Sequence, residues 1–386
     1  MRKFYTAEAV TEGHPDKLCD QIADAILDVC LKQDEQSRVA CEVLATKGTI
    51  IVAGEITSTY EPDVFAVVRK VLSDVGYSSE GIAMDTFVHR QSPDIAGAVD
   101  TSKERREGVS DNQIDWFQGA GDQGVMIGYA CDETKQRMPM PVVLANRIVR
   151  ELSACRQSSY IQGILPDGKA QVTVEYENGK PVRLDSVVVS CQHTEDKNLK
   201  KLEAEIRKKV LLPALRLLPP DEDTKIFINP SGRFVCGGMD ADTGLTGRKL
   251  MVDSYGSMVP HGGGAFSGKD CSKVDRSATY MARYIAKNIV AAGLASKCQV
   301  SLAYAIGVAQ PVMVQVDTFG TGKVCADDCL ELAIPLVFGL TPKQIVDSLR
   351  LTRPIFRQTA AFGHFGRKEF PWERTDKVEA LRNAVI

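Results

Sequence analysis

The sequence of 386 residues has no surplus of basic residues. Its formal net charge is -3, and its isoelectric point is about 6.0. Proteins that coat nucleic acids or bind anionic membrane surfaces usually carry a basic surplus. We therefore expect no nucleic acid and no membrane as a partner, and basic residues should matter only where they gather locally.

Long apolar runs are also missing. No stretch approaches the roughly 18 apolar residues that a membrane-spanning helix needs. The first residues, MRKFYTAEAVTEGHPDK, lack the apolar core of a secretory signal peptide. Hydrophobic residues make up 44% and charged residues 25% of the chain, as in an ordinary soluble globular protein. We expect a cytoplasmic protein whose length suits two or three domains.

The sequence lacks the cysteine and histidine spacings of a metal site. Its 11 cysteines are odd in number and include no CxxC pair, and its five histidines lie far apart, so a zinc site is not expected. Scattered thiols in a long chain fit a reducing compartment. Cys271 lies in a glycine-rich segment, and its thiol is either redox-sensitive or packed and inert.

The first part of the sequence has clear secondary-structure patterns. Apolar residues recur at helical spacing after Pro15, which predicts a helix over 16–32 with Asp16 in its first turn. Strands are predicted at Val39–Leu44 and Thr49–Ile56, joined by a turn at 47–48. Glu42 and Glu55 interrupt these apolar runs, so each carboxylate lies on a solvated face or is held by a ligand or ion.

Later elements favour an α+β fold. Residues 171–191 alternate around Asn178-Gly179 and predict a hairpin. Further helices are expected near 142–157, 195–212, 275–293 and 341–350, and strands near 225–229, 299–306 and 312–317. Such an order predicts helices packed on one face of antiparallel or mixed sheets. Residues 91–121 show little periodicity and are interpreted as a mobile lid or a disordered connector.

The densest chemical signal is HGGGAFSGKDCSKVDR, residues 261–276. Its glycines allow the backbone to approach a ligand, and Lys269 and Lys273 would share one face if the segment were helical. The spacing nearly matches a phosphate-binding P-loop, but Asp270 replaces the required Ser or Thr, and no buried strand precedes the segment. The sequence predicts an anion-cradling loop, with a surface turn carrying solvated lysines as the alternative.

Weaker signals elsewhere have the same character. GHPDK, residues 13–17, places a histidine and an aspartate at a helix start, where anions are favoured. Asp16 then either holds a divalent cation or is a plain first-turn acid. Arg248-Lys249 follows two glycines, and Asp167-Gly-Lys169 taken alone is an ordinary polar turn. Cations beside glycines, together with carboxylates, suit a triphosphate and its metal ions.

Eight strings in register resemble the methionine adenosyltransferases (S-adenosylmethionine synthetases) of bacterial type, from about residue 3 to 377. They are GHPDK, GEIT, QSPDI, GAGDQG, FINPSGRF, GLTGRK, HGGGAFSGKD and the C-terminal GHFGR…FPW. The resemblance implies that ATP and L-methionine react with water to give S-adenosyl-L-methionine, phosphate and diphosphate. The methionine sulfur would attack the ribose C5′, and the released triphosphate would be hydrolysed in the same site.

The resemblance also implies the residues of the triphosphate site. His14 would lie beside the bond that breaks. The cations that would neutralise the phosphates are Lys169, Arg248, Lys249 and Lys269. Of these five, His14, Lys169, Arg248 and Lys269 are the expected catalytic residues.

Metal ions and the remaining substrate contacts follow from the same resemblance. Asp16 and Asp275 would ligate two Mg²⁺ per site, and Glu42 would help to bind one K⁺ per subunit. The further ATP-binding residues would be Asp122, Asp167, Arg233, Phe234, Asp242 and Ala265. Phe234 would stack on adenine, and Asp122 would come from a partner subunit. The methionine-binding residues would be Glu55, Gln91, Asp242 and Lys273.

The implied architecture is three pseudo-symmetric α+β domains. They would span 1–100, 115–232 and 233–386, with the active-site loop at 91–121. Members assemble as dimers, usually paired into homotetramers as dimers of dimers, with active sites at the dimer interface. Two rival functions stay open at this point: an ATP-dependent phosphotransferase that uses the Gly-Lys loop, and a catalytically silent regulatory paralogue.

Overall fold

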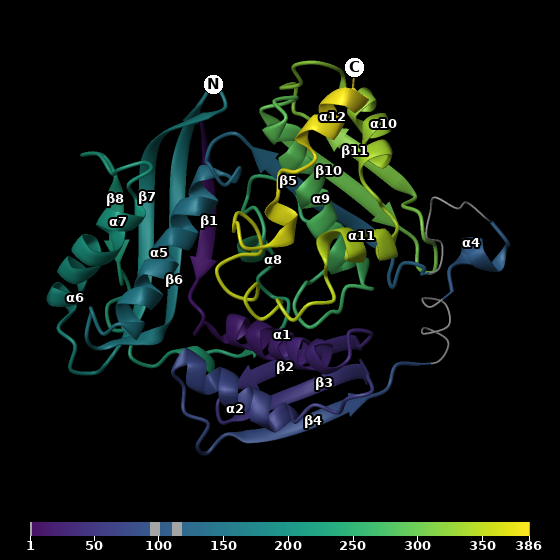
Figure 1. Cartoon of the computed structure of the whole chain (residues 1–386). Coiled ribbons are helices and arrows are strands. Elements are labelled where there is room, and N and C mark those ends of the chain that lie inside the picture. Colours follow the sequence, from purple (N-terminus) through teal and green to yellow (C-terminus); the bar gives the residue numbers. More distant parts are fainter. Residues whose placement is uncertain (1, 93–100, 110–117, 386) are drawn as a thin grey trace.

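The chain forms an α+β structure with three separate β-sheets, each with helices against it (Figure 1). The computed structural model describes residues 2–92, 101–109 and 118–385. The first sheet has the order β4(Ala83–His89)-β3(Thr49–Thr57)-β2(Arg38–Thr46)-β9(Gly244–Leu245). Helices α1(Pro15–Gln33) and α2(Val64–Val75) belong to it, and α1 packs on β2.

The second sheet has the order β1(Arg2–Val10)-β6(Ile164–Glu177)-β7(Lys180–His193)-β8(Lys225–Ile228). Helix α5(Met140–Gln157) packs on β6 and β1. A helical segment follows β7 as α6(Leu199–Ile206), a π-helical turn at Arg207–Leu211 and α7(Leu212–Ala214). The hydrophobic core between this second sheet and its helices is separate from the large core that the other two sheets share.

The third sheet has the order β11(Met313–Asp317)-β10(Lys297–Tyr304)-β5(Gly124–Cys131), and α9(Val274–Ala291) packs on β5 and β10. The C-terminal part adds α10(Asp327–Val337), α11(Pro342–Leu349) and α12(Val378–Ala384). Two short helices lie elsewhere, α4(Lys103–Arg106) and α8(Leu250–Asp253), and single 3₁₀ turns lie at Gly238–Asp240 and Pro371–Glu373. No single described helix is long and apolar enough to span a membrane; α10 and α11 meet that criterion only together, as a pair bent by 75°.

The three sheets repeat one topology, in which each sheet takes a strand from another part of the chain. A strand, a helix and an antiparallel hairpin follow one another as β1–α1–β2–β3, as β5–α5–β6–β7 and as β9–α9–β10–β11, with α8 between β9 and α9. In each case the leading strand joins a different sheet from the hairpin that follows it: β1 pairs with β6, β5 with β10, and β9 with β2. This exchange ties the three parts of the chain together in a closed cycle.

Most elements predicted from periodicity are confirmed. The helix at 16–32 is α1, the strands at 39–44 and 49–56 are β2 and β3, and the hairpin around Asn178-Gly179 is β6–β7. The helix expected at 195–212 starts later and changes to π-helical winding at Arg207. Two of the sheets are mixed, because β3–β4 and β7–β8 are parallel pairs, and the β11-β10-β5 sheet is antiparallel.

Helix α1 carries four aspartates at four-residue spacing, opposite its apolar face. Asp16, Asp20, Asp24 and Asp28 accept backbone N–H bonds from Leu245, Gly247, Gly268 and Phe356, at 2.9–3.0 Å. Asp28 accepts a second one from Arg357. A helix places every fourth residue on one face, so this acid ladder holds three distant loops along a single line.

Two fully buried arginines on α9 hold the neighbouring segments in place. Arg276 binds both carboxylate oxygens of Asp24 at 2.7 Å, and its other three N–H donors go to Lys269 O, Thr359 Oγ1 and Tyr280 Oη. All five donors of the guanidinium are therefore used. Arg283, two turns later, likewise places all five donors, on Glu373 and on three backbone carbonyls.

Replacing Arg276 with methionine should lower the free energy of unfolding by roughly 3–5 kcal/mol, because Asp24 would stay buried without its partner. The matched control is Arg207→Met, which breaks an exposed ion pair with Glu203 and should cost less than about 1 kcal/mol. Urea unfolding followed by circular dichroism measures both values. Equal small losses in the two variants would show that the Asp24–Arg276 pair does not hold the fold.

Candidate active site

Two basic loops lie side by side along one edge of β2. On the first loop, Leu245 pairs with Leu44, and Thr246 N donates to Val43 O at 3.0 Å. On the second loop, Cys41 N donates to Gly268 O at 2.9 Å, and Lys269 pairs with Ala40. The aspartates of the acid ladder on α1 accept hydrogen bonds from backbone N–H groups of the same two loops. Arg248, Lys249 and Lys269 therefore come from one continuous edge, although 20 residues of sequence separate the loops.

His14 and Asp16 form the first cluster of candidate site residues. His14 caps α1, with its Nδ1 accepting the Asp16 N–H at 3.2 Å. The buried Asp16 carboxylate binds Lys249 Nζ and Leu245 N, and Arg248 Nε lies 3.6 Å away. Because His14 Nδ1 accepts a hydrogen bond, a neutral ring carries its proton on Nε2. A neutral N–H donor thus stands beside two cations.

The electrostatics of this cluster follow from burial and from the nearby lysines. Burial and the charges of Lys249 and Lys169 lower the pKa of His14 to about 3. Burial raises the pKa of Asp16, but the hydrogen bonds from Lys249 and Leu245 outweigh it and bring the pKa below its ordinary value. At neutral pH the cluster therefore holds an uncharged imidazole and an ionised carboxylate.

The glycine-rich segment supplies a second pair, Lys269 with Asp275, whose Nζ and Oδ2 atoms lie 2.5 Å apart. A side chain at Gly264 would collide with Asp275, since a Cβ there would lie 2.1 Å from its Oδ1. The GAGDQG loop lies against the same segment, with Gly121 N donating to Ser272 O at 3.1 Å. In this chain Asp122 therefore lies on a loop that contacts the segment between Lys269 and Asp275.

The condition under which Lys269 and Lys273 would share a helical face is not met. Helix α9 begins only at Val274, so residues 269–273 are not helical. Lys269 turns to Asp275, whereas the buried Lys273 binds Asp270, whose Oδ2 also accepts the Val39 N–H at 2.6 Å. Asp270, which ruled out a P-loop, is thus a fixing point between the glycine-rich segment and β2.

Asp167 marks a third group of candidate residues. It is buried, its Oδ2 accepts the Gly238 N–H at 2.8 Å, and its Oδ1 has no hydrogen-bond partner among the described residues. Burial raises its pKa, which the Gly238 hydrogen bond and Lys169 oppose. A buried acceptor without a donor is costly, so Asp167 Oδ1 is suited to a ligand N–H or O–H group.

The other nucleotide candidates lie around Asp167 and the first basic loop. Phe234 N donates to His193 Nε2 at 3.0 Å, and its ring is half-buried. Arg233 is exposed and paired with Glu195. Asp242, also exposed, donates its N–H to Gly238 O. The Ala265 Cβ touches Gly247, where an added Cβ would lie 2.6 Å from it.

Glu42, Glu55 and Gln91 lie on or after the strands of the first sheet. Glu42 lies on β2 and keeps part of its side chain in solvent; the partial burial of its carboxyl raises the pKa of that group, and the charge of Lys269 opposes this. Glu55 pairs with His89 at 3.1 Å and lies opposite Ala40, two strands from Lys269. Gln91 N donates to Thr57 Oγ1 at 3.2 Å. Glu42 therefore lies on the strand that both basic loops contact, whereas Glu55 and Gln91 lie on or beyond the next strand of the sheet.

Within the described ranges, no three His, Cys, Asp or Glu side chains converge as a metal cluster. Asp16 and Asp275 nevertheless fit Mg²⁺, because this ion uses one or two carboxylates and completes its shell with water and substrate phosphates. Each of these carboxylates is presently held by a lysine that could move to a phosphate. The donor chemistry therefore agrees with a metal that binds together with its polyphosphate.

Parts of the expected active-site loop at 91–121, namely 93–100 and 110–117, lie outside the described residues. Between them, α4 docks on the loop after β10. Lys103 N donates to Gly307 O at 2.8 Å, and Glu104 accepts the N–H groups of Ala309 and Gln310. Cys271 is buried, and burial raises the pKa of its thiol well above its ordinary range, which favours the packed, inert interpretation.

The acid ladder is the functional feature that the sequence interpretation missed. It recognised Asp16 but not Asp20, Asp24 or Asp28, which position the loops through their backbone N–H groups. The signal was present: four aspartates at four-residue spacing on a helix whose opposite face is apolar. Lys17, buried between Asp20 and Asp253, shows the same requirement for compensated charge.

His14 should stay neutral across the range around pH 6.5 in which an ordinary histidine titrates. The folded state disfavours its imidazolium, so the unfolded chain binds the proton first, and stability should fall as the pH drops from 6.5 towards about 3. NMR of ¹⁵N-labelled histidine, assigned with the His14→Asn variant, follows the ring. A titration midpoint near 6.5 would contradict the predicted environment.

Comparison with known protein families covers nearly the whole chain. Three family models match: S-adenosylmethionine synthetase, N-terminal domain, at residues 2–99; the central domain at 117–234; and the C-terminal domain at 236–374. They occur in order and without overlap. Their succession agrees with three sheets, basic loops and carboxylates suited to a polyphosphate. The chain belongs to the S-adenosylmethionine synthetase family.

Proposed function

We propose that this protein is a methionine adenosyltransferase. It would convert ATP, L-methionine and water into S-adenosyl-L-methionine, phosphate and diphosphate. The observation that supports this most directly is the pair of basic loops on one edge of β2, next to two carboxylates. Family membership supports the same reaction.

The proposed chemistry begins at the ribose C5′. A lone pair of the methionine sulfur forms the S–C5′ bond, the C5′–O bond breaks, and the electron pair leaves with the triphosphate. A neutral sulfur becomes a sulfonium while a highly charged group departs. Correct alignment of sulfur and carbon can supply roughly 7–11 kcal/mol, and each preorganised contact to the leaving anion about 3–4 kcal/mol.

The residues of this chain would act mainly on the leaving group. His14 Nε2–H would donate a hydrogen bond to the oxygen that separates from C5′. A neutral donor suits this position because the triphosphate leaves as an anion and needs no proton from the ring. Lys169, Arg248, Lys249 and Lys269 would bind the phosphate oxygens. Two bound Mg²⁺ ions would offset phosphate charge, with Asp16 and Asp275 as their carboxylate ligands, and the displaced lysines would then contact phosphate.

The remaining assignments are parts of the same proposal. Asp167, Arg233, Phe234 and Ala265 would surround the nucleoside, with Asp242 between nucleotide and methionine. Glu55, Gln91 and Lys273 would bind methionine, which requires Lys273 to leave Asp270 or to act through it. We further propose three domains at 1–100, 115–232 and 233–386, a mobile loop at 91–121, a cytoplasmic homotetramer with sites at the dimer interface, and Asp122 acting across that interface.

Conversion of labelled methionine to a sulfonium, with phosphate and diphosphate released, tests the proposed reaction. ATP consumption should depend on methionine. A phosphotransferase would instead cleave ATP at the γ-phosphate and form no sulfonium, whereas a silent regulatory paralogue would bind ATP without turnover. Equal ATP consumption with and without methionine, and no sulfonium, would reject the proposal.

Lys269→Ala should keep the fold but lower turnover at least tenfold, because the departing triphosphate would lose one charge contact. Lys208→Ala is the matched control, since Lys208 is an exposed lysine on the second domain's surface. Thermal unfolding verifies that both variants fold. Turnover of the Lys269 variant at the wild-type rate would remove this lysine from the site.

Potassium should stimulate the reaction, and Glu42→Gln should abolish that stimulation while the magnesium requirement stays. The amide removes the charge that holds the cation and retains the size of the side chain. Glu80→Gln, at an exposed turn, serves as control. Initial rates at fixed ionic strength, with K⁺ replaced by tetramethylammonium, separate the specific effect from screening. Identical potassium responses in both variants would refute the Glu42 assignment.

A further inference from the structure

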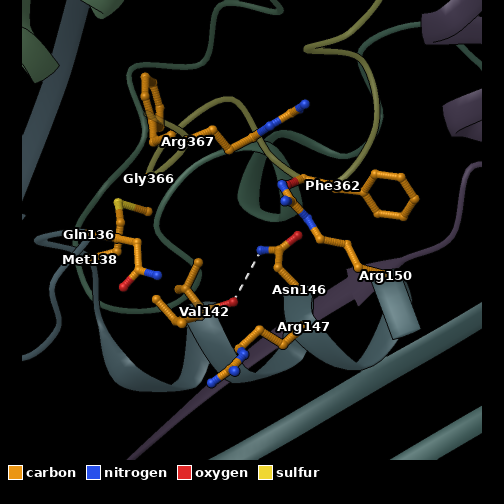
Figure 2. Close-up of a pocket in the computed structure, with 11 residues that line it drawn as sticks. Gln136, Met138, Val142, Asn146, Arg147, Arg150, Phe362, Gly366 and Arg367 are labelled. Carbon is orange, nitrogen blue, oxygen red and sulfur yellow. Dashed lines mark hydrogen bonds between the residues drawn. The ribbon is translucent and has the colours of Figure 1, made fainter. Parts of the chain in front are cut away.

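A pocket between α5 and the segment at 361–367 has none of the candidate active-site residues in its lining. Figure 2 shows it with side chains from both segments, among them Asn146, Arg147, Arg150, Phe362 and Arg367. Its volume of about 80 Å³ is several times the roughly 10–15 Å³ that admits one water molecule. The space therefore suits an ion of a few heavy atoms.

Positive charge is in excess in this pocket. Arg147 has no hydrogen bond or ion pair with any described residue, whereas Arg367 pairs with Glu369 at 2.9 Å. The Arg150 guanidinium donates from Nη2 to Phe362 O at 3.3 Å and lies 5.5 Å from the Phe362 ring centroid. Burial and then the charge of Arg367 lower its pKa to about 10. Three guanidinium groups thus line the pocket and none of its lining residues is acidic; Glu369, outside the lining, pairs with Arg367.

Two buried polar atoms of the pocket have no hydrogen-bond partner in the described chain. Arg150 Nε is a donor without an acceptor, and Asn146 Oδ1 is an acceptor without a donor. Asn146 Nδ2 already donates to Val142 O at 3.1 Å, the dashed line in Figure 2. Leaving a buried charged N–H unpaired is costly, so both atoms call for one ligand that accepts and donates.

We propose that this pocket binds a small tetrahedral oxyanion, for which inorganic phosphate is the representative. Its unprotonated oxygens accept from Arg150 Nε–H and from Arg147, and its remaining hydroxyl donates to Asn146 Oδ1. Guanidinium groups match the oxygen spacing of phosphate. The phosphoryl end of a larger metabolite offers the same oxygens to the arginines, but its dianion has no hydroxyl for Asn146, so free phosphate is the better match.

The proposed oxyanion site is tested by direct binding rather than by turnover. A negative binding result is therefore distinguishable from failure of the proposed reaction. Inorganic phosphate is titrated by calorimetry into the full-length Arg248→Ala/Lys269→Ala protein, in which the candidate active site has lost two phosphate contacts. One site per chain should remain. Adding Arg150→Met, which retains the packing of the side-chain stem, should weaken this binding at least tenfold.

Arg216→Met is the matched control, because Arg216 is an exposed arginine away from the pocket, and it should leave the affinity unchanged. If Arg150→Met does not fold, Arg147→Met takes its place with the same expected loss. Competition with phenyl phosphate distinguishes the sources: displacement indicates a phosphoryl group on a larger molecule, and no displacement indicates free phosphate. No binding in the active-site variant, or equal binding after loss of Arg150 or Arg147, would overturn the proposal and leave a pocket that holds only water.

Discussion

Buried charge that must be compensated is the constraint on which the rest of this structure depends. Helix α1 buries Asp16, Asp20 and Asp24, and an isolated carboxylate in such a place would cost several kcal/mol. The chain compensates them with backbone N–H groups of two distant loops and with Arg276. Fold stability and site geometry are therefore one requirement, because the donors that stabilise α1 belong to the loops that carry the candidate phosphate-binding cations.

The candidate site is made of charges that are already paired in the single chain. Lys249 lies on Asp16, Lys269 on Asp275 and Lys273 on Asp270. Such pairing keeps the cations close to where the polyphosphate is proposed to bind and limits their repulsion. A polyphosphate that arrives with divalent metals offers both kinds of partner at once, so carboxylates and lysines can exchange partners without any of them becoming unpaired. Charge balance would then be kept before and after binding.

Local pattern predicted the elements well and their arrangement hardly at all. Helix α1, the β2–β3 hairpin and the β6–β7 hairpin follow from periodicity and turn residues, which act over a few positions. The short β9, the pairing of β1 with β6 and the attachment of Lys269 to β2 depend on contacts between remote segments, which no local pattern encodes. The motifs indicated many of the residues that belong together. They did not indicate Asp20 and Asp24, which in the sequence look like ordinary polar positions of an amphipathic helix.

The cyclic exchange of strands has a consequence for synthesis on the ribosome. Arg2 on β1 pairs with Glu177 on β6, and Leu44 on β2 pairs with Leu245 on β9. At translation rates of about 5–20 residues per second, β1 waits on the order of ten to thirty seconds for its partner strand. During that time the nascent chain exposes an unpaired strand edge, which is prone to aggregation. We therefore expect the three sheets to be completed only after the last third of the chain has left the ribosome.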